Sequence, residues 1–487
     1  MYIRWFKNIT IKDVPSVGGK NASLGEMYQY LTPQGINIPN GFAITANAYY
    51  YFLDKGKIRK PIEKLLKNLN PQDIKSLQRI GKEIRKLIIQ TPLPKNLEKQ
   101  IIEAYHQLSK EYGETDTDVA VRSSATAEDL PSASFAGQHE TFLNVRGEKA
   151  LLESVKKSYE SLFLDRAISY RIEKGFNHMK VAISTGVQKM VRSDLGSSGI
   201  MFTLDTESGF KNIIVINGIY GLGELIVKGK IIPDEFLVFK PTLQKGYKAI
   251  IRKDLGQKFV KYIYDKKGGI KEVKVNEKVQ QRFCINDEDV LTLAQWGMLI
   301  EEHYSNKTKR WNPQDIEWAK DGKTGELFIV QSRPETVHSI SDSNIYKEYI
   351  LNAKKKPLIT GVAIGSKVGY GQTRIIKSIK DLPQLKKGEV LVTKMTDPDW
   401  TSAMPLASAI ITDEGGKTCH AAIISRELGI PCIVGTKKAT KILKTGQEIT
   451  VDCTSGSEGK VFSGKIPYRE KTYELKKIPH LKTKISI

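Results

Sequence analysis

The chain has 487 residues, a formal net charge of +22, 40% hydrophobic residues and 27% charged residues. This length exceeds what one hydrophobic core supports and predicts about three domains, and the composition is that of a globular protein rather than a disordered one. Because the sequence lacks an apolar run of about 18 residues and a signal-peptide core, we expect a cytoplasmic protein with no membrane span or leader.

The basic excess and the cysteines indicate no particular partner. The lysines are dispersed and no nucleic-acid-binding motif accompanies them, so we expect a solvated basic surface and no specific nucleic-acid partner. A basic RNA-binding protein is kept as a distant alternative. The cysteines show no CxxC spacing, which argues against a zinc site or a disulfide framework and predicts free thiols. They are Cys284, Cys419, Cys432 and Cys453.

A glycine pair precedes a lysine at the start of the first predicted helix. Residues 17–27 read VGGKNASLGEM, and the Lys20 ammonium beside helix-start N–H groups suits a phosphate, although this is not a Walker motif. A solvated lysine is an equally good interpretation. Residues 38–45 then predict a turn entering a strand, and residues 46–53 the helix after it.

A second candidate anion site lies at the end of an apolar run. Arg122 closes this run and precedes SSATAEDLPSASFAGQ, a loop of small and hydroxyl residues that is able to close over a nucleotide. Forked arginine donors suit phosphate oxygens, and a loop salt bridge is the alternative. Residues 148–174 predict a long amphipathic helix or a closely spaced pair. Strands are predicted after it at 181–190, 199–204, 213–219 and 235–239.

Four polar residues lie on, or directly beside, the strands of a predicted hairpin at 316–331. Asp315 and Glu317 are two residues apart on the first strand, and Gln331 and Arg333 repeat that spacing on the second. Residues two apart on a strand share a face. If the strands pair, carboxylates, an amide oxygen and a guanidinium meet in one patch that suits Mg²⁺ and phosphates. A cross-strand salt bridge is the alternative.

The chain changes character after this hairpin. Residues 341–357 are polar with little periodicity and are predicted to form a linker. A compact α/β unit is expected at 358–466, with strands at 361–368, 389–393, 409–412 and 449–452. The segment 467–487 ends in TKISI, which looks like the opening of a strand.

The most distinctive motif lies in this second unit. The loop GGKTC leads into His420 and a predicted helix at 421–428 that Gly429 ends. The free N–H groups and dipole at a helix start stabilise a phosphoryl group, and the Thr418 hydroxyl is able to donate to it. Because imidazole can act as a nucleophile, these features predict a phosphohistidine, with an ordinary helix cap as the alternative.

These motifs closely resemble those of the phosphoenolpyruvate synthase (pyruvate, water dikinase) family. TDPDW, IITD and GGKTCHAAIISRELGIPCIVGT are similar to its phosphohistidine domain, and VGGK, VRSSATAED, VQKMV, GLGE, PDEF and the hairpin are similar to its ATP-grasp domain. The resemblance implies ATP binding by Lys20, Arg122, Gln188, Glu224, Asp315, Glu317, Gln331 and Arg333. It implies Mg²⁺ ligation by Glu317 and Gln331, and catalysis by Arg122, Thr418 and His420.

The resemblance also implies a fold and a reaction. The expected fold is α/β (α+β), with an ATP-grasp-type nucleotide-binding domain at 1–340, the linker, a swivelling phosphohistidine domain at 358–466, and the start of a barrel domain at 467–487. ATP held with Mg²⁺ would phosphorylate His420, which would pass the phosphoryl group to pyruvate. The net reaction is ATP, pyruvate and water to AMP, phosphate and phosphoenolpyruvate.

The pyruvate-binding barrel of that family is expected to lie outside this chain. We therefore expect a separate barrel polypeptide or a homo-oligomer, with the incomplete product of a broken gene as the alternative. Two alternatives remain open: a phosphocarrier module, and a phosphotransferase to another acceptor, as in the related rifamycin phosphotransferases.

Overall fold

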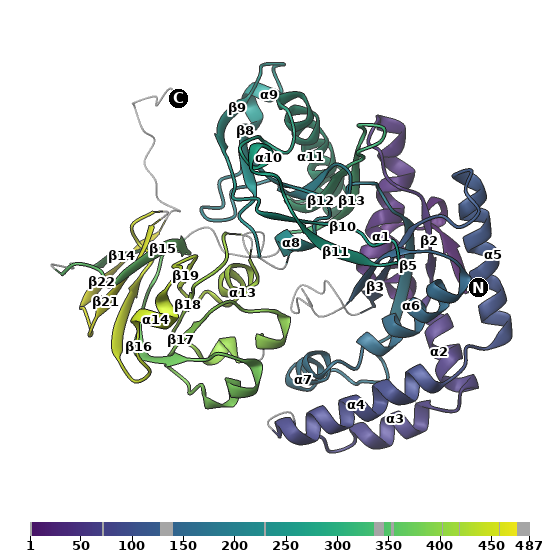
Figure 1. Cartoon of the computed structure of the whole chain (residues 1–487), viewed down its shortest axis with the longest axis horizontal. Helices are drawn as coiled ribbons and strands as arrows, with labels where there is room; N and C mark the ends of the chain where they lie inside the picture. Colours follow the sequence, from purple (N-terminus) through teal and green to yellow (C-terminus); the bar gives the residue numbers. More distant parts are fainter. Residues whose placement is uncertain are drawn as a thin grey trace. The chain divides into compact units, whose positions relative to one another are not determined.

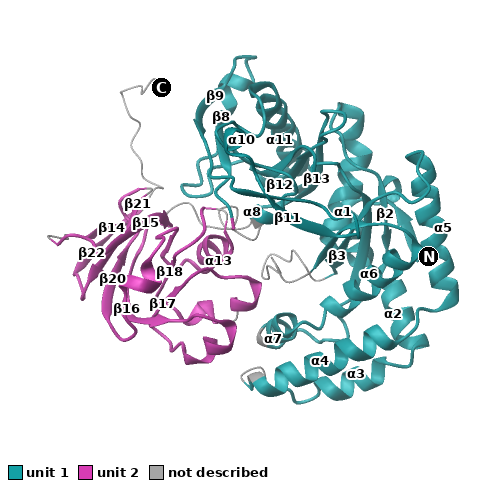
Figure 2. Cartoon of the chain, in the orientation of Figure 1, with its two compact units in different colours: residues 1–226, 231–335 teal, residues 227–230, 336–487 magenta. Residues whose placement is uncertain are grey.

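The computed structural model describes residues 2–70, 73–126, 140–227, 230–335, 345–351, 355–401, 403–417, 419–456 and 458–474. They divide into two compact units (Figure 2). The first comprises Met1–Ile226 and Ile231–Glu335, and the second Val227–Lys230 and Thr336–Ile487. Both units mix helices and strands, which confirms the predicted fold class.

A five-stranded antiparallel sheet and a helical layer form one part of the first unit. The strand order is β1 (Ile3–Trp5), β2 (Gly41–Ile44), β5 (Ile183–Lys189), β3 (Val119–Ala125) and β4 (Thr141–Val145). The helices that share its apolar core (Figure 1) are α2 (Ala46–Lys55), α3 (Arg59–Leu66), α4 (Ile74–Gln90), α5 (Lys95–Glu111), α6 (Glu148–Ser161) and α7 (Asp165–Glu173). The amphipathic stretch 148–174 is thus a pair of helices, one of the two predicted forms.

A six-stranded antiparallel sheet forms the other part. Its order is β13 (Leu327–Pro334), β12 (Gln314–Lys320), β6 (Ser197–Phe202), β7 (Ile213–Tyr220), β8 (Asp234–Phe239) and β9 (Ile250–Asp254). The long helix α11 (Asp287–Thr308) packs on this sheet. The rest of this part of the unit consists of shorter elements: α8 (Glu224–Val227), α9 (Lys240–Leu243), α10 (Glu277–Gln280), and the separate hairpin of β10 (Val260–Tyr264) and β11 (Ile270–Lys274). The strands predicted between 181 and 239 are all confirmed.

Helix α1 (Val14–Tyr30) contacts both sheets. It is kinked at Gly18, whose φ is 73° and where an added Cβ would lie 2.3 Å from Ser124 Oγ on β3. Only glycine tolerates both this backbone conformation and this approach. On the other side, the buried Glu26 carboxylate accepts from His303 Nε2 at 2.9 Å and pairs with Lys307 Nζ at 3.0 Å on α11. Burial alone would raise the pKa of Glu26, but these partners lower it to about 2. The start of α1, with Lys20, is therefore held in a defined place.

The second unit is built on a closed barrel. Its strand order is β15 (Ile359–Ile364), β19 (Cys432–Val434), β18 (Ala409–Thr412), β17 (Val390–Thr393), β16 (Val368–Ile375), β20 (Glu448–Asp452) and β21 (Glu458–Ser463). Helix α13 (His420–Leu428) follows β18, and α14 (Ala439–Ile442) follows β19. The predicted strand at 361–368 is wrong in its extent, because Gly365, with φ of 77°, separates β15 from β16.

The predicted linker at 341–357 contains a strand, and so does the segment 467–487, whose predicted strand opening at 483–487 lies outside the described residues. Strand β14 (Ile345–Leu351) lies in the first and pairs antiparallel with β22 (Tyr468–Glu474) in the second. The rings of Tyr349 and Tyr468 lie 5.9 Å apart across this pair. Strand β14 reads IYKEYIL and β22 reads YREKTYE, and each is only seven residues long. The pairing joins residues more than a hundred positions apart, and a local reading of the sequence therefore missed it.

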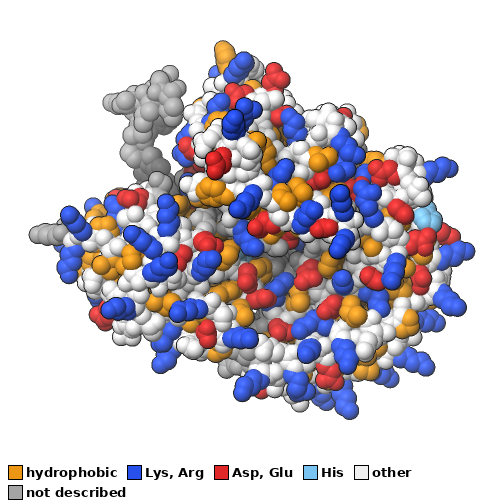
Figure 3. All heavy atoms as spheres, viewed as in Figure 1, with side chains coloured by type: hydrophobic (Ala, Val, Ile, Leu, Met, Phe, Trp, Pro, Cys, Tyr) orange, Lys and Arg blue, Asp and Glu red, His pale blue; other side chains and the backbone are white. Residues whose placement is uncertain are grey.

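Two further predictions concern the basic surface and membrane-spanning helices. On the face in Figure 3, Lys and Arg side chains are scattered among acidic ones rather than gathered into one patch. None of the described helices combines the length and apolar character that a membrane span requires.

Candidate functional site

The predicted hairpin forms with the register that brings its four polar residues together. Asp315 on β12 is the direct partner of Arg333 on β13, and Glu317 is the direct partner of Gln331. A bulge follows at Glu317/Trp318. Directly opposed side chains on one face of an antiparallel pair are close enough to interact. The patch that the sequence predicted is therefore present.

Ion pairs connect this patch to the other sheet. Arg333 donates to Asp315 Oδ2 from Nε at 2.9 Å and from NH2 at 2.7 Å. Arg122 reaches in from β3, and its NH2 donates to Glu317 Oε2 at 2.7 Å and to Gln331 Oε1 at 2.6 Å. These short, charge-assisted contacts hold carboxylates and guanidinium groups against each other. The cross-strand salt bridge that the sequence left as an alternative is thus real, but it lies within a larger cluster.

The other predicted nucleotide-site residues lie on several elements. Gln188 on β5 is 3% exposed, and its Oε1 lies 3.5 Å from Arg122 NH1, which places it beside the cluster. Lys20 lies on α1, two residues after the kink at Gly18. Glu224 is the first residue of α8. Thr418 and most of the loop after Arg122 lie outside the described residues.

Glu317 and Gln331 have the chemistry of a magnesium site. Their carboxylate and amide oxygens converge on one cationic nitrogen, Arg122 NH2, within 2.7 Å. Among the described residues, no group of three or more His, Cys, Asp or Glu side chains is placed to hold a metal alone. Magnesium is commonly bound by one or two protein oxygens together with substrate phosphates. The donor set therefore fits Mg²⁺ shared with a polyphosphate.

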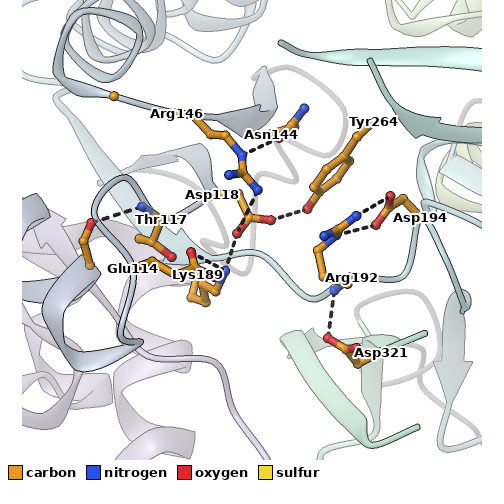
Figure 4. A network of polar contacts seen from close by, with 12 residues as sticks. Glu114, Thr117, Asp118, Asn144, Arg146, Lys189, Arg192, Asp194, Tyr264 and Asp321 are labelled. Atoms are coloured by element: carbon orange, nitrogen blue, oxygen red, sulfur yellow. Dashed lines mark hydrogen bonds and ion pairs between the residues drawn. The ribbon is translucent and has the colours of Figure 1, made fainter. Parts of the chain in front are cut away.

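A polar network lies at the end of β5, whose last residue is Lys189 (Figure 4). At its centre, Asp118 accepts from Lys189 Nζ and, at 2.8 Å, from Tyr264 OH. The Arg192 guanidinium lies over the Tyr264 ring, 4.8 Å from its centroid, and pairs with Asp194. Burial would raise the pKa of Asp118, but the Lys189 ammonium and the Tyr264 hydroxyl outweigh it and lower that pKa. The sequence analysis did not identify Asp118 or Tyr264, because an acidic residue before a strand and a single tyrosine form no recognisable motif.

We expect Asp118→Asn to lower the free energy of unfolding of the first unit by about 2–3 kcal/mol at pH 7, because Lys189 then loses a buried counter-charge. The folded-state pKa of Asp118 lies below its ordinary value. The contribution of Asp118 to the free energy of unfolding is therefore fully present above the ordinary pKa and is lost as the pH falls through the folded-state pKa. The difference from wild type should therefore shrink below about pH 4. Denaturant unfolding at pH 7 and pH 3 measures it. Asp254→Asn, at an exposed pair with Arg252, is the matched control. A loss of equal size at both pH values would contradict this account.

In the second unit, His420 begins α13 as predicted. The helix runs His420–Leu428, Cys419 is its N-cap, and Gly429 ends it with φ of 64°. The loop before it packs tightly, since a Cβ added at Gly415 would lie 2.7 Å from Cys419 Sγ. Burial raises the pKa of the Cys419 thiol, which suits a filler of a small apolar site rather than a reactive group. The imidazole thus lies at the positive end of a helix dipole.

Two threonine hydroxyls hold the imidazole ring. Thr396 Oγ1 lies 2.9 Å from His420 Nδ1, and Thr401 Oγ1 lies 3.2 Å from Nε2. The short helix η5 (Pro398–Trp400) turns the chain so that both threonines face the ring. A hydroxyl can donate or accept, so one nitrogen can keep its proton while the other presents a lone pair. Thr396 belongs to a motif that the sequence analysis noted, whereas Thr401 was missed because its role depends on this turn.

Two family models match successive parts of the chain. The family model described as "Pyruvate phosphate dikinase, AMP/ATP-binding domain" matches residues 14–352, and the one described as "PEP-utilising enzyme, mobile domain" matches residues 385–456. The phosphoenolpyruvate synthase of Aquifex aeolicus (strain VF5) is 54% identical over 99% of this chain and 57% of its own length. Those of Helicobacter pylori (strain ATCC 700392 / 26695) and Escherichia coli (strain K12) are 50% and 47% identical, over 100% and 99% of this chain.

The chain spans only part of the length of these relatives: 57%, 61% and 60% respectively. Each relative matches essentially all of this chain as part of one longer polypeptide. The comparisons therefore do not support the expected separate barrel polypeptide.

Proposed function

The chain belongs to the pyruvate phosphate dikinase AMP/ATP-binding domain family, and from that premise we propose that it carries the ATP-dependent histidine phosphorylation of a phosphoenolpyruvate synthase. The observation that carries the proposal is the convergence of Arg122, Glu317 and Gln331 from two sheets on one point. These groups supply a cation for phosphates and two oxygens for a metal. The buried, oriented imidazole of His420 supplies the acceptor.

The proposed chemistry begins at the nucleotide. In the first step, a lone pair on His420 attacks the β-phosphorus of ATP, the bond to the α-phosphate oxygen breaks, and AMP leaves with pyrophosphate on the histidine. Water then cleaves the terminal phosphate and leaves phosphohistidine. Bound Mg²⁺ would neutralise part of the negative charge on the phosphates. Arg122 and Arg333 bind phosphate oxygens, and Thr396 and Thr401 orient the ring and hold its proton.

Delivery to pyruvate completes the proposed reaction, with phosphoenolpyruvate as the product. The relatives are named phosphoenolpyruvate synthases, and their identity of 47–54% over nearly the whole chain supports this acceptor. The phosphocarrier and the transferase to another acceptor share the first steps and differ only in the group that receives the phosphate. The acceptor is therefore tested separately from the histidine.

The test uses ATP labelled at one phosphate at a time. With Mg²⁺ and β-labelled ATP, the protein should acquire acid-labile, base-stable label, as expected for phosphohistidine. With γ-labelled ATP, the label should leave as inorganic phosphate. Pyruvate, added with a polypeptide that corresponds to the remaining length of the relatives, should then accept the phosphoryl group and give phosphoenolpyruvate. Stable label from the γ position would contradict the order of steps, and discharge only by another acceptor would favour the alternatives.

A further inference from the structure

Arg122 links the two sheets of the first unit. It lies on β3 of the five-stranded sheet, yet its guanidinium contacts the hairpin β12–β13 of the six-stranded sheet. Besides Glu317 and Gln331, it donates from NH1 to the Val330 carbonyl oxygen at 2.9 Å. Its side chain is only 12% exposed. These contacts are therefore shielded from water, where such hydrogen bonds to a charged group are strong.

The same oxygens cannot hold the guanidinium and a metal together. Arg122 NH2 lies 2.7 Å from Glu317 Oε2 and 2.6 Å from Gln331 Oε1. A magnesium ion bound to those two oxygens on the side that faces Arg122 would lie about 2.1 Å from each, inside the space that NH2 occupies. Both groups are cations, so they would also repel each other. Either the arginine or the metal can take this place, but not both.

We propose that Arg122 and a divalent cation are alternative occupants of the Glu317 and Gln331 oxygens, and that the nucleotide phosphates complete the exchange by receiving Arg122. This inference rests on the proposed function, which supplies the metal and the phosphates. Without ligands, Arg122 neutralises Glu317. With both ligands bound, the metal neutralises Glu317 and the phosphates neutralise Arg122, so each charge keeps a partner.

The exchange couples the two ligands. A metal that arrives alone must displace Arg122 and leave a shielded guanidinium without an anion, which is costly. A nucleotide that arrives alone must draw Arg122 away and leave Glu317 without a cation. When both bind, neither cost remains, so each ligand raises the affinity for the other by the same factor. The site therefore binds the metal–nucleotide complex more tightly than it binds the metal alone or the nucleotide alone.

The experiment measures binding of Mn²⁺, a paramagnetic substitute for Mg²⁺, by the spin-resonance signal of the free ion. Without nucleotide, Arg122→Met should bind Mn²⁺ about 10-fold more tightly than wild type, because the competing cation is gone. With the β,γ-imido analogue of ATP, the variant should lose most of the coupling that wild type shows. Arg122→Lys keeps the charge but lacks the second nitrogen that donates to the Val330 carbonyl oxygen, so it should give an intermediate gain.

Matched controls separate this exchange from general charge effects. Arg374→Met removes the same charge from an ion pair with Glu389 in the second unit and should leave Mn²⁺ binding unchanged. Circular dichroism checks the folding of each variant. If wild type binds Mn²⁺ with the analogue but Arg122→Met gains nothing without it, the exchange is wrong and the metal site stands. If wild type fails to bind Mn²⁺ even with the analogue, the metal assignment fails and the exchange with it.

Discussion

The variant His420→Ala is expected to retain no label from β-labelled ATP. Imidazole is the proposed nucleophile, and the alanine side chain offers no atom that can form the phosphoramidate bond. The affinity for ATP should change little, since the nucleotide cluster of Arg122, Glu317 and Gln331 belongs to the other compact unit. Acid-lability assays and equilibrium binding of the β,γ-imido analogue measure the two properties independently.

The controls for this variant address folding and specificity. His420 is 7% exposed and packs against Thr396 and Thr401, so His420→Asn, which keeps a polar group near Thr396, is a second variant with a smaller cavity. His106→Ala removes a half-exposed histidine that pairs with Glu148 and should retain full label. Label that persists on both His420 variants would show that another residue is phosphorylated.

The parts of the site that the sequence predicted depend on local spacing. Alternation along two neighbouring strands placed Asp315, Glu317, Gln331 and Arg333 on one face, and the observed register follows it. The glycine-bounded helical period placed His420 at a helix start, as the structure has it. In both cases the signal lies within about twenty residues, where a period of 2 or 3.6 decides the geometry.

The parts that the sequence did not predict depend on contacts between distant segments. Arg122 was singled out for phosphates, but its contact with Glu317 joins residues 195 positions apart on different sheets. The ring contact of Thr401 requires the turn at η5. The Asp118 network likewise joins strand ends that have no common period. Such contacts arise from packing of whole elements, and no local pattern encodes them.

The variant Glu317→Ala is expected to remove both metal-dependent nucleotide binding and histidine labelling. Its carboxylate is one of two oxygens proposed to hold the metal, so Mn²⁺ affinity in the presence of the β,γ-imido analogue should fall by more than the roughly 10- to 100-fold that loss of an outer-shell partner costs. Labelling should fall at least as far, because uncompensated phosphate charge opposes attack by the imidazole. Folding should persist, because Arg122 keeps Gln331 and the Val330 carbonyl as acceptors.

Glu326→Ala is the matched control for this variant. Glu326 is an exposed carboxylate at the turn of the same hairpin, and its loss should leave Mn²⁺ affinity and labelling unchanged. The comparison distinguishes a ligand from a general acidic contribution, because both variants remove one negative charge within one hairpin. Glu317→Ala and Arg122→Met are expected to have opposite effects on Mn²⁺ binding without nucleotide. Arg122→Met should strengthen it, whereas Glu317→Ala should weaken it. Normal labelling by Glu317→Ala would leave the Arg122–Glu317 contact as a structural ion pair and would move the metal site elsewhere.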